Sequence, residues 1–416
     1  MSRALARSGA PAAAAAATFG ALPYGLHLIE EDDVQAVAAV LRGKLLAQGP
    51  QVAAFERAFA AETGAADAAA VSSGTAALHV ALAAAGVGPG DVCVVPAVTF
   101  LSTATAALHC GAEVVFADVD PDTGLATPAT VERAIDRAIE QAGRVKAVLP
   151  VHLSGRLCDV EALSALARTH GAALIEDACH ALGGTDGAGA PVGACGWSDA
   201  AVFSFHPVKT IAAGEGGMVT VKDPAWAERI RRLRNHGVTR EAGLMSEPGS
   251  FDEAGVSNPW SYEQLELGFN YRMNEMEAAL GLSQLGKLGR FVARRRALAA
   301  RYDRLLQAFG DRVRPAPTPP GQVPALHLYT VLVDFAAAGL ARADLMRALV
   351  EKGIGTQVHY IPLYRQPFFR RRYGYLRLPG AEAYYARCLA LPLFPAMADA
   401  HVDQVVLALG EVLGGL

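Results

Sequence analysis

The sequence has 416 residues, of which 52% are hydrophobic, and its formal net charge is −4 at pH 7. A chain of this length exceeds what a single hydrophobic core usually supports, so we expect two domains. The small negative charge is not gathered in long blocks of one sign, which argues against nucleic acid or an anionic membrane as a partner.

Six cysteines are scattered along the chain, without a CxxC pair or a His/Cys cluster at metal-ligand spacing. We interpret them as reduced thiols of a cytoplasmic protein and predict no metal site. Residues 1–21 are rich in alanine and are predicted to form a disordered tail, because their apolar run is too short and too weakly apolar for an export signal. No segment offers the roughly 20 uninterrupted apolar residues of a membrane span.

Two helices are predicted next, over residues 30–42 and 51–63. From Asp67 to about Lys222, short apolar runs then alternate with helical stretches, which is typical of parallel strands joined by crossover helices. The predicted strands are nearly all apolar, as expected when both faces of a sheet are covered. They span residues 68–71, 91–96, 113–118, 147–152, 173–177, 201–204 and 217–221.

The remainder of the chain is predicted to begin with one long helix over residues 276–309. A proline-rich joint then leads to a strand over 328–334, a helix over 342–352, a strand over 355–361 and a terminal helix. We therefore expect an α/β fold. Residues 22–309 would form N-terminal helices and a large domain with a mostly parallel sheet flanked by helices, and residues 310–416 a small C-terminal α+β domain.

Several predicted strands end in a polar side chain, namely Ser72, Asp118, His152, Asp177 and Ser204. In open α/β sheets the carboxyl edge of the strands is where ligands bind. These residues are therefore the first candidates for a site.

The run Ser72-Ser73-Gly74-Thr75 joins the first core strand to a helix through small side chains. Free amides at a helix N-terminus, together with the positive end of the helix dipole, favour a phosphate. Serine and threonine also cap helices without any ligand, and from these residues alone capping is equally good.

Asp177 follows an apolar strand at the predicted ligand edge, three residues before His180. A buried carboxylate there can keep a pyridinium nitrogen protonated, which makes pyridoxal phosphate an electron sink. The simpler alternative is that Asp177 caps a helix. His180 could lie beside the cofactor ring or be an interior histidine with satisfied hydrogen bonds.

Lys209 lies in the segment Phe203-Ser204-Phe205-His206-Pro207-Val208-Lys209, which is followed by Gly214-Glu215-Gly216-Gly217. A lysine held on a constrained loop near apolar rings can have its pKa lowered enough to form a Schiff base. Most lysines are only solvated surface charges. An anion cradle, an acidic residue for a ring nitrogen and a loop lysine, in this chain order, are together the parts of a fold-type I pyridoxal enzyme.

At these residues the sequence resembles the DegT/DnrJ/StrS family of nucleotide-sugar aminotransferases, and the likeness runs from about Leu22 to the C-terminus. The resemblance implies pyridoxal 5'-phosphate bound covalently to Lys209. It also implies a catalytic role for His180, near the 3-hydroxyl group of the cofactor. Further cofactor contacts are implied as well. These contacts are Asp177 at the ring nitrogen, Phe100 stacked on the ring, and Ser73, Gly74, Thr75 and Ser204 at the phosphate.

The resemblance also implies a homodimer with shared active sites, in which Asn270 reaches the cofactor phosphate of the neighbouring subunit. Trp260, Tyr262, His359 and Tyr360 are candidates for binding the nucleotide-sugar. They could equally be packing residues. The chain departs from the family at Tyr364, where relatives often have histidine, and at Cys179, where a smaller residue is usual.

One branch of the family fits best, the UDP-4-amino-4,6-dideoxy-N-acetyl-β-L-altrosamine transaminases of pseudaminic acid biosynthesis. It is similar in Pro259-Trp260-Ser261-Tyr262 and in Val358-His359-Tyr360-Ile361-Pro362. This branch implies transfer of an amino group from L-glutamate to the C4 ketone of a UDP-linked 4-keto-6-deoxy-N-acetylhexosamine. A dTDP- or GDP-linked keto-sugar is the alternative.

Two functions of other classes are weighed against this interpretation. A catalytically silent relative that only senses cofactor or sugar would have no need of Lys209. A dinucleotide-binding oxidoreductase would need G-x-G-x-x-G after the first core strand, and the chain has Ser72-Ser73-Gly74-Thr75 there.

Overall fold

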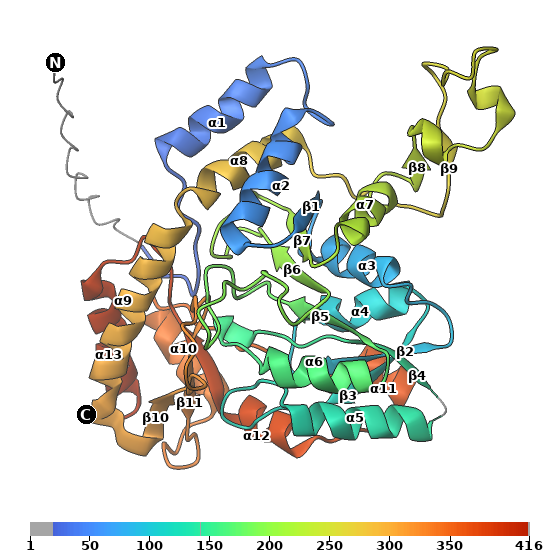
Figure 1. The fold of residues 1–416 in the computed structure, drawn as a ribbon. Helices are drawn as coiled ribbons and strands as arrows, with labels where there is room; N and C mark the ends of the chain where they lie inside the picture. The colour runs from blue at the N-terminus through green and yellow to red at the C-terminus, as the bar shows by residue number, and fades with distance from the viewer. Residues whose placement is uncertain (1–19, 142, 415–416) are drawn as a thin grey trace, which may run out of the picture.

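A seven-stranded sheet forms the centre of the protein. The structure is a computed structural model, and it describes residues 20–141 and 143–414. The predicted N-terminal tail lies, up to residue 19, outside the described part of the chain. Figure 1 shows the sheet with helices on both faces. The strands are β1 (Asp67–Val71), β2 (Asp91–Pro96), β3 (Glu113–Ala117), β4 (Arg144–Val148), β5 (Ala173–Asp177), β6 (Ala200–Ser204) and β7 (Gly217–Val221).

The strand order is β1-β7-β6-β5-β4-β2-β3. Strands β6, β5, β4, β2 and β3 are parallel neighbours, whereas β7 is antiparallel to both β1 and β6. The expected mostly parallel sheet is therefore confirmed. One predicted strand is misplaced, because the segment expected over residues 147–152 begins at Arg144 and ends before Pro150, which has no N–H to donate.

Alternate residues of one strand face different cores. Ala69 and Val71 belong to a cluster with α3 (Gly74–Ala84), whereas Ala68 and Ala70 belong to a second cluster with Phe55 of α2 (Pro50–Thr63). This alternation follows from the two-residue period of a strand. The helices around the sheet also include α1 (Glu31–Arg42), α4 (Leu101–His109), α5 (Pro128–Glu140), α6 (Val160–Thr169) and α7 (Pro224–Leu233).

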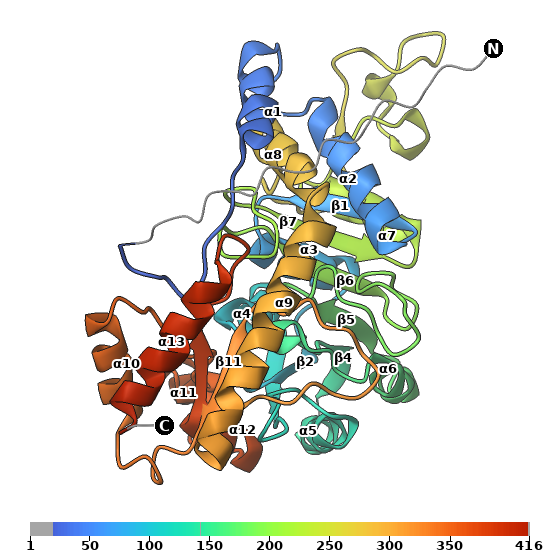
Figure 2. The same ribbon diagram turned by 90° about the vertical axis from the view of Figure 1, so that its left-hand side faces the viewer.

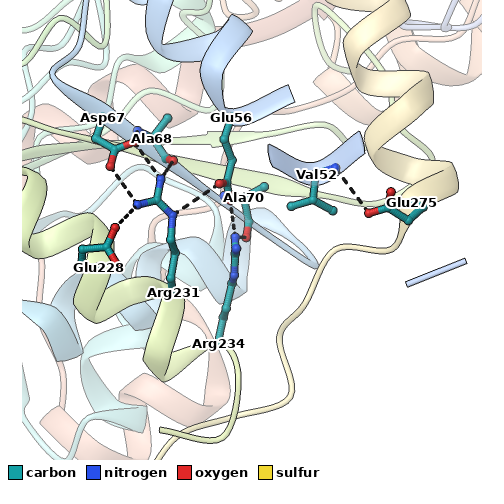
Figure 3. Close-up of polar contacts among 9 residues, drawn as sticks. All are labelled: Val52, Glu56, Asp67, Ala68, Ala70, Glu228, Arg231, Arg234 and Glu275. Atoms are coloured by element: carbon teal, nitrogen blue, oxygen red, sulfur yellow. Dashed lines mark hydrogen bonds and ion pairs between the residues drawn. The ribbon is translucent and has the colours of Figure 1, made fainter. Parts of the chain in front are cut away.

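An ion-pair network fastens α2 and α7 to the edge strand β1 (Figure 3). Glu56 of α2 accepts hydrogen bonds from Arg231 of α7, from Arg234 just after this helix, and from the backbone amide of Ala70. Arg231 also binds Asp67 at the start of β1, at 2.8 Å. These partly buried charges hold the edge of the sheet from which the chain turns into α3.

The prediction of one continuous helix over residues 276–309 is wrong. The segment forms two helices, α8 (Glu275–Leu285) and α9 (Leu288–Leu306), with a break at Gly286 and Lys287. Glycine has a low helix propensity, and the Lys287 ammonium turns to Asp32 and Asp33 of α1, at 2.6 and 2.7 Å. The sequence pattern does not show this tertiary contact.

The C-terminal part of the chain forms a three-stranded antiparallel sheet of β10 (Val313–Pro315), β11 (Tyr329–Val333) and β12 (Cys388–Leu391). Its core also includes the second half of α9, α10 (Arg342–Glu351) and α13 (Asp399–Val412), which lie together in Figure 2. Two further helices, α11 (Pro367–Tyr373) and α12 (Pro379–Arg387), pack on the core of the large sheet. The division at residue 310 stays a prediction.

The strand predicted over residues 355–361 is wrong. Gln357 pairs with Ala390 through a single bridge, and the chain then leaves the sheet toward Pro362. Instead, β12, which the sequence did not predict, pairs with the free edge of the central strand β11. Among the described helices, none has the length and apolar character that crossing a membrane requires.

A segment between α7 and α8 stands away from the body of the molecule (Figure 1). It contains the short strands β8 (Val238–Thr239) and β9 (Glu263–Gln264), which pair with each other rather than with the large sheet. Its exposed apolar side chains are Leu244, Val256, Trp260, Tyr262, Leu265 and Leu267.

Candidate active site

A cavity of about 760 Å³ opens at the carboxyl edge of the large sheet. It is lined by residues from β5, from the loop between β6 and β7, from the starts of α3 and α4, and from the segment 357–366. The predicted site residues that it brings together are Ser73, Gly74, Thr75, Phe100, Asp177, His180, Ser204, Lys209, His359 and Tyr360.

Lys209 lies on the loop that joins β6 to β7. Ser204 and Gly217, the last residue of β6 and the first of β7, are register partners, so the loop is fixed at both ends. Inside the loop, the Lys209 amide donates a hydrogen bond of 2.8 Å to the carbonyl of His206. Burial lowers the pKa of the Lys209 amine, although Cys179 and Asp177 nearby oppose the shift. A lysine with a lowered pKa has the free amine that attack on a carbonyl requires.

Asp177 ends β5 and is buried. Its Oδ2 accepts a hydrogen bond of 2.8 Å from Oγ1 of Thr103, and its Oδ1 accepts one of 3.2 Å from the amide of Cys179. No helix begins here, because residues 179–183 form turns. The helix-capping alternative for Asp177 is therefore wrong, and the carboxylate is held at the wall of the cavity by hydrogen bonds to both oxygens.

The start of α3 forms a cradle beside β6. Ser73 caps the helix, with its Oγ accepting from the amide of Ala76 at 3.1 Å, so the capping alternative holds for this side chain. The amides of Gly74 and Thr75, in the first turn, have no intrahelical acceptor and remain for a ligand. A Cβ on Gly74 would lie 2.8 Å from Cβ of Ser204, so only glycine allows this close approach.

His180, Tyr360 and Phe100 form an aromatic part of the cavity wall. The Nε2 atom of His180 lies 3.3 Å from the hydroxyl of Tyr360, and the rings of Tyr360 and Phe100 are 6.0 Å apart. Burial, with Lys209 and His359 nearby, holds the pKa of His180 well below its ordinary value. Burial and Lys209 also lower the pKa of His359, to about 3. Both imidazoles are therefore neutral at physiological pH.

Other predicted residues do not line this cavity. Trp260 and Tyr262 lie on the projecting segment, with 72% and 59% of their surface exposed, and Asn270 is also exposed. Tyr364 turns into the core, where its hydroxyl donates to Glu382 at 2.8 Å.

Two of the polar strand ends are also used elsewhere. Asp118 accepts hydrogen bonds from the amides of Gly380 and Ala381 at the start of α12. His152 is fully buried against Glu176, with Nε2 and Oε2 2.7 Å apart.

The sequence interpretation missed Thr103 and His327. Thr103 lies in the first turn of α4, four residues after Thr99, and the two hydroxyls are 2.8 Å apart. This i, i+4 spacing beside Phe100 is the signal that could have revealed the pair. His327 lines the cavity with its ring 4.5 Å from that of His180, and it comes from a distant segment with no local motif.

The residues fit pyridoxal 5'-phosphate in the chemistry of their donors. The cradle at Gly74 and Ser204 suits a phosphate, the Asp177 carboxylate suits a ring nitrogen, and the Lys209 amine suits an aldehyde. Together with the seven-stranded sheet, these groups define a pyridoxal-phosphate-dependent aminotransferase of fold type I.

The chain belongs to the DegT/DnrJ/EryC1/StrS aminotransferase family, which residues 27–410 match. It is 39% identical over 397 residues to the spore coat polysaccharide biosynthesis protein SpsC of Bacillus subtilis (strain 168), covering 95% of this chain and 97% of SpsC.

Solved structures agree with this membership. Helicobacter pylori PseC, an aminotransferase involved in the biosynthesis of pseudoaminic acid, superposes with a TM-score of 0.84 at 27% identity, covering 94% of this chain and 99% of PseC. S. venezuelae DesV, solved in complex with a ketimine intermediate, has a TM-score of 0.80 at 33% identity, covering 92% of this chain and 95% of DesV.

Proposed function

We propose that this enzyme transfers an amino group from L-glutamate to the C4 ketone of a UDP-linked 4-keto-6-deoxy-N-acetylhexosamine, in a pathway of the pseudaminic acid type. The observation that carries the amino-transfer chemistry is the cavity that Lys209 and Asp177 share with the Gly74 cradle. The similarity in fold to PseC supports the choice of sugar.

In this proposal each residue has a defined task. Pyridoxal phosphate, when bound, supplies the electron sink for the carbanion formed at the substrate carbon. Lys209 holds the cofactor between turnovers and then moves the substrate proton with its amine Nζ. Asp177 keeps the ring nitrogen protonated, and Gly74, Thr75 and Ser204 bind the phosphate. Phe100, which lines the cavity, would offer apolar surface to the cofactor ring.

The nucleotide-sugar would lie toward His359 and Tyr360, which line the cavity. We further propose a cytoplasmic homodimer in which Asn270, Trp260 and Tyr262 reach the neighbouring active site. The exposure of Trp260 and Tyr262 in the single chain supports this proposal, because large exposed apolar groups are characteristic of interaction surfaces.

A second candidate is amino transfer to another nucleotide-linked keto-sugar that enters a polysaccharide. The observation that favours it is the 39% identity to SpsC, a protein of spore coat polysaccharide biosynthesis. The chemistry at Lys209 is the same in both candidates, and only the acceptor differs.

The test is an assay of the purified enzyme with L-glutamate and a panel of UDP-, dTDP- and GDP-linked 4-keto-6-deoxy sugars, with 2-oxoglutarate as the measured product. The proposal expects the highest kcat/KM with the UDP-linked N-acetylated sugar. Preference for a dTDP- or GDP-linked sugar would support the second candidate. A lack of 2-oxoglutarate with every acceptor would contradict both.

A further inference from the structure

The imidazole of His180 is fixed in one tautomer by the main chain. The backbone N–H of Ser154 donates to Nδ1 of His180, at 3.3 Å. A nitrogen that accepts a hydrogen bond carries no proton, and a neutral imidazole has one proton in all. Since His180 is neutral, its proton must be on Nε2.

Ser154 is itself held firmly. It is buried, its φ of 63° lies in the left-handed region, and its Oγ lies 2.9 Å from Oγ1 of Thr330 in β11. The amide of Ser154 therefore has a defined direction, set by the turn Leu153–Gly155.

The fixed tautomer decides the direction of the next hydrogen bond. Nε2 of His180 lies 3.3 Å from the Tyr360 hydroxyl and, carrying the proton, is the donor in this pair. The phenol oxygen is then the acceptor, so its own hydrogen is available for another partner. Burial raises the pKa of Tyr360, so the hydroxyl keeps that hydrogen. Tyr360 lines the cavity, so an acceptor atom of a ligand bound there can take this hydrogen.

The cavity has few groups for an anionic substrate. Among the described residues that line it, Lys209 is the sole lysine or arginine, and the proposed function commits its amine to the cofactor. Asp177 and Glu215, also in the lining, are carboxylates. A carboxylate entering this part of the site must therefore be bound by neutral donors within the subunit.

We propose that the Tyr360 hydroxyl, held as a donor by His180 and through it by the Ser154 amide, binds a carboxylate oxygen of the amino-acid donor. This inference rests on the proposed function for the identity of the ligand. Tyr360 is then a substrate-binding residue, and His180, assigned from the sequence to the cofactor's 3-hydroxyl group, is instead a positioning residue that acts through Tyr360.

The first experiment compares Tyr360→Phe with wild-type enzyme loaded with pyridoxal phosphate. L-glutamate and the nucleotide-sugar are titrated separately, the first followed by the change in cofactor absorbance. Loss of a hydrogen bond to a charged group should raise the Kd for glutamate roughly ten-fold, and by a larger factor than it raises the Kd for the sugar. Tyr364→Phe is the matched control, because that hydroxyl faces Glu382.

An unchanged Kd for glutamate would overturn the proposal. So would a loss confined to the sugar, because the hydroxyl would then bind the acceptor instead. A Tyr364→Phe variant that weakens glutamate binding equally would show that the effect comes from general destabilisation, and would also overturn it.

The second experiment needs neither turnover nor cofactor. The 15N chemical shifts of the ring nitrogens of His180, assigned by comparison with His180→Gln, report its tautomer in the wild-type protein. We expect a protonated Nε2 and an unprotonated Nδ1, and a protonated Nδ1 would overturn the proposal. If no amino acid reacts with the enzyme, the proposed function fails on its own, whereas this measurement still decides the direction of the His180–Tyr360 hydrogen bond.

Discussion

Thr103 donates a hydrogen bond of 2.8 Å from its Oγ1 to Oδ2 of Asp177, and the two residues come from different crossover units of the sheet. Thr103 belongs to α4, which follows β2, whereas Asp177 ends β5. The hydroxyl of Thr99 lies 2.8 Å from that of Thr103. The carboxylate that faces the cavity is thus oriented by a pair of threonines on a neighbouring loop and helix.

Replacement of Thr103 by valine keeps the shape of the side chain and removes the donor to Asp177. The carboxylate loses one of its two fixed hydrogen bonds, so we expect kcat to fall about ten-fold, equivalent to about 1.4 kcal/mol. The rate of the glutamate half-reaction measures this. Thr99→Val is the control, because Thr99 contacts Thr103 and not the carboxylate, and its effect should be smaller.

Lys209→Ala should abolish amino transfer, because no other amine lines the described cavity. The visible absorbance of lysine-bound cofactor should disappear, while thermal unfolding should show that the fold is retained. Lys222→Ala is the matched control at an exposed lysine, and it should behave like wild type. Normal transamination by the Lys209 variant would refute the assignment.

Gly74→Ala should weaken cofactor binding. The new Cβ would lie 2.8 Å from Cβ of Ser204, which closes the cradle at the start of α3. We expect the Kd for pyridoxal phosphate to rise by about ten-fold or more, since overpacking typically costs about 1–3 kcal/mol. Gly88→Ala is the control, because nothing lies within 4 Å of its Cβ. Equal affinity in the two variants would show that the cradle does not bind the phosphate.

Glu176→Ala should destabilise the large domain. Glu176 is buried, accepts from Ser198 and faces the fully buried His152, with Oε2 and Nε2 2.7 Å apart. Removing one partner of a buried pair leaves the other uncompensated and should lower the free energy of unfolding by about 3 kcal/mol. The control is Glu411→Ala, which breaks an exposed pair with Lys352 and should cost at most about 1 kcal/mol. Urea unfolding of both variants would show whether the loss in free energy of unfolding depends on the burial of the pair.

His79 should make the stability depend on pH in the acid range. It is buried in α3 with Nδ1 3.3 Å from the Tyr271 hydroxyl, and burial, with His109 nearby, lowers its pKa from 6.5 to about 4. Between these values the unfolded chain binds the proton more readily than the folded protein does. The free energy of unfolding should therefore fall as the pH falls from about 6.5 toward about 4, and this residue should have no effect above that window.

His79→Phe keeps a ring against Phe269, 4.6 Å away, and should reduce the slope of stability against pH in that window. The exposed His170→Gln serves as the control and should leave the slope as it is in wild type. An unchanged slope in His79→Phe would mean that another group titrates. Urea titrations at several pH values would provide the slopes.

The sequence predicts the large sheet well because its strands are continuous apolar runs with clear turns between them. All seven predicted strands of this sheet are present, and six begin and end within a residue of their predicted limits. The segment near Pro150 is the exception, since β4 ends at Val148 and pairing resumes after Pro150 only as a single bridge between Val151 and Asp177. The predictions fail where a tertiary contact overrides a local pattern, as at Lys287 and at residues 355–361.

The cavity residues divide in the same way. Asp177, Ser204 and Lys209 could be predicted because each lies at a strand end or in the loop that follows one. Thr103 and His327 could not, since their roles depend on which distant segment lies beside them. The roles of Asn270, Trp260 and Tyr262 stay predictions, because they lie outside the cavity of the single chain.

The pairing of Ser204 with Gly217 holds together the two ends of the loop that carries Lys209, at the ends of the adjacent strands β6 and β7. A shift of the two ends of this loop would require both strands to slip by a residue, which would turn every buried side chain of β6 to the opposite face. Any movement of the Lys209 amine during catalysis must therefore come from rotation about the bonds of its side chain. The backbone of the loop stays in place. The length of the lysine side chain therefore limits how far from Lys209 the reacting carbon of each substrate can lie.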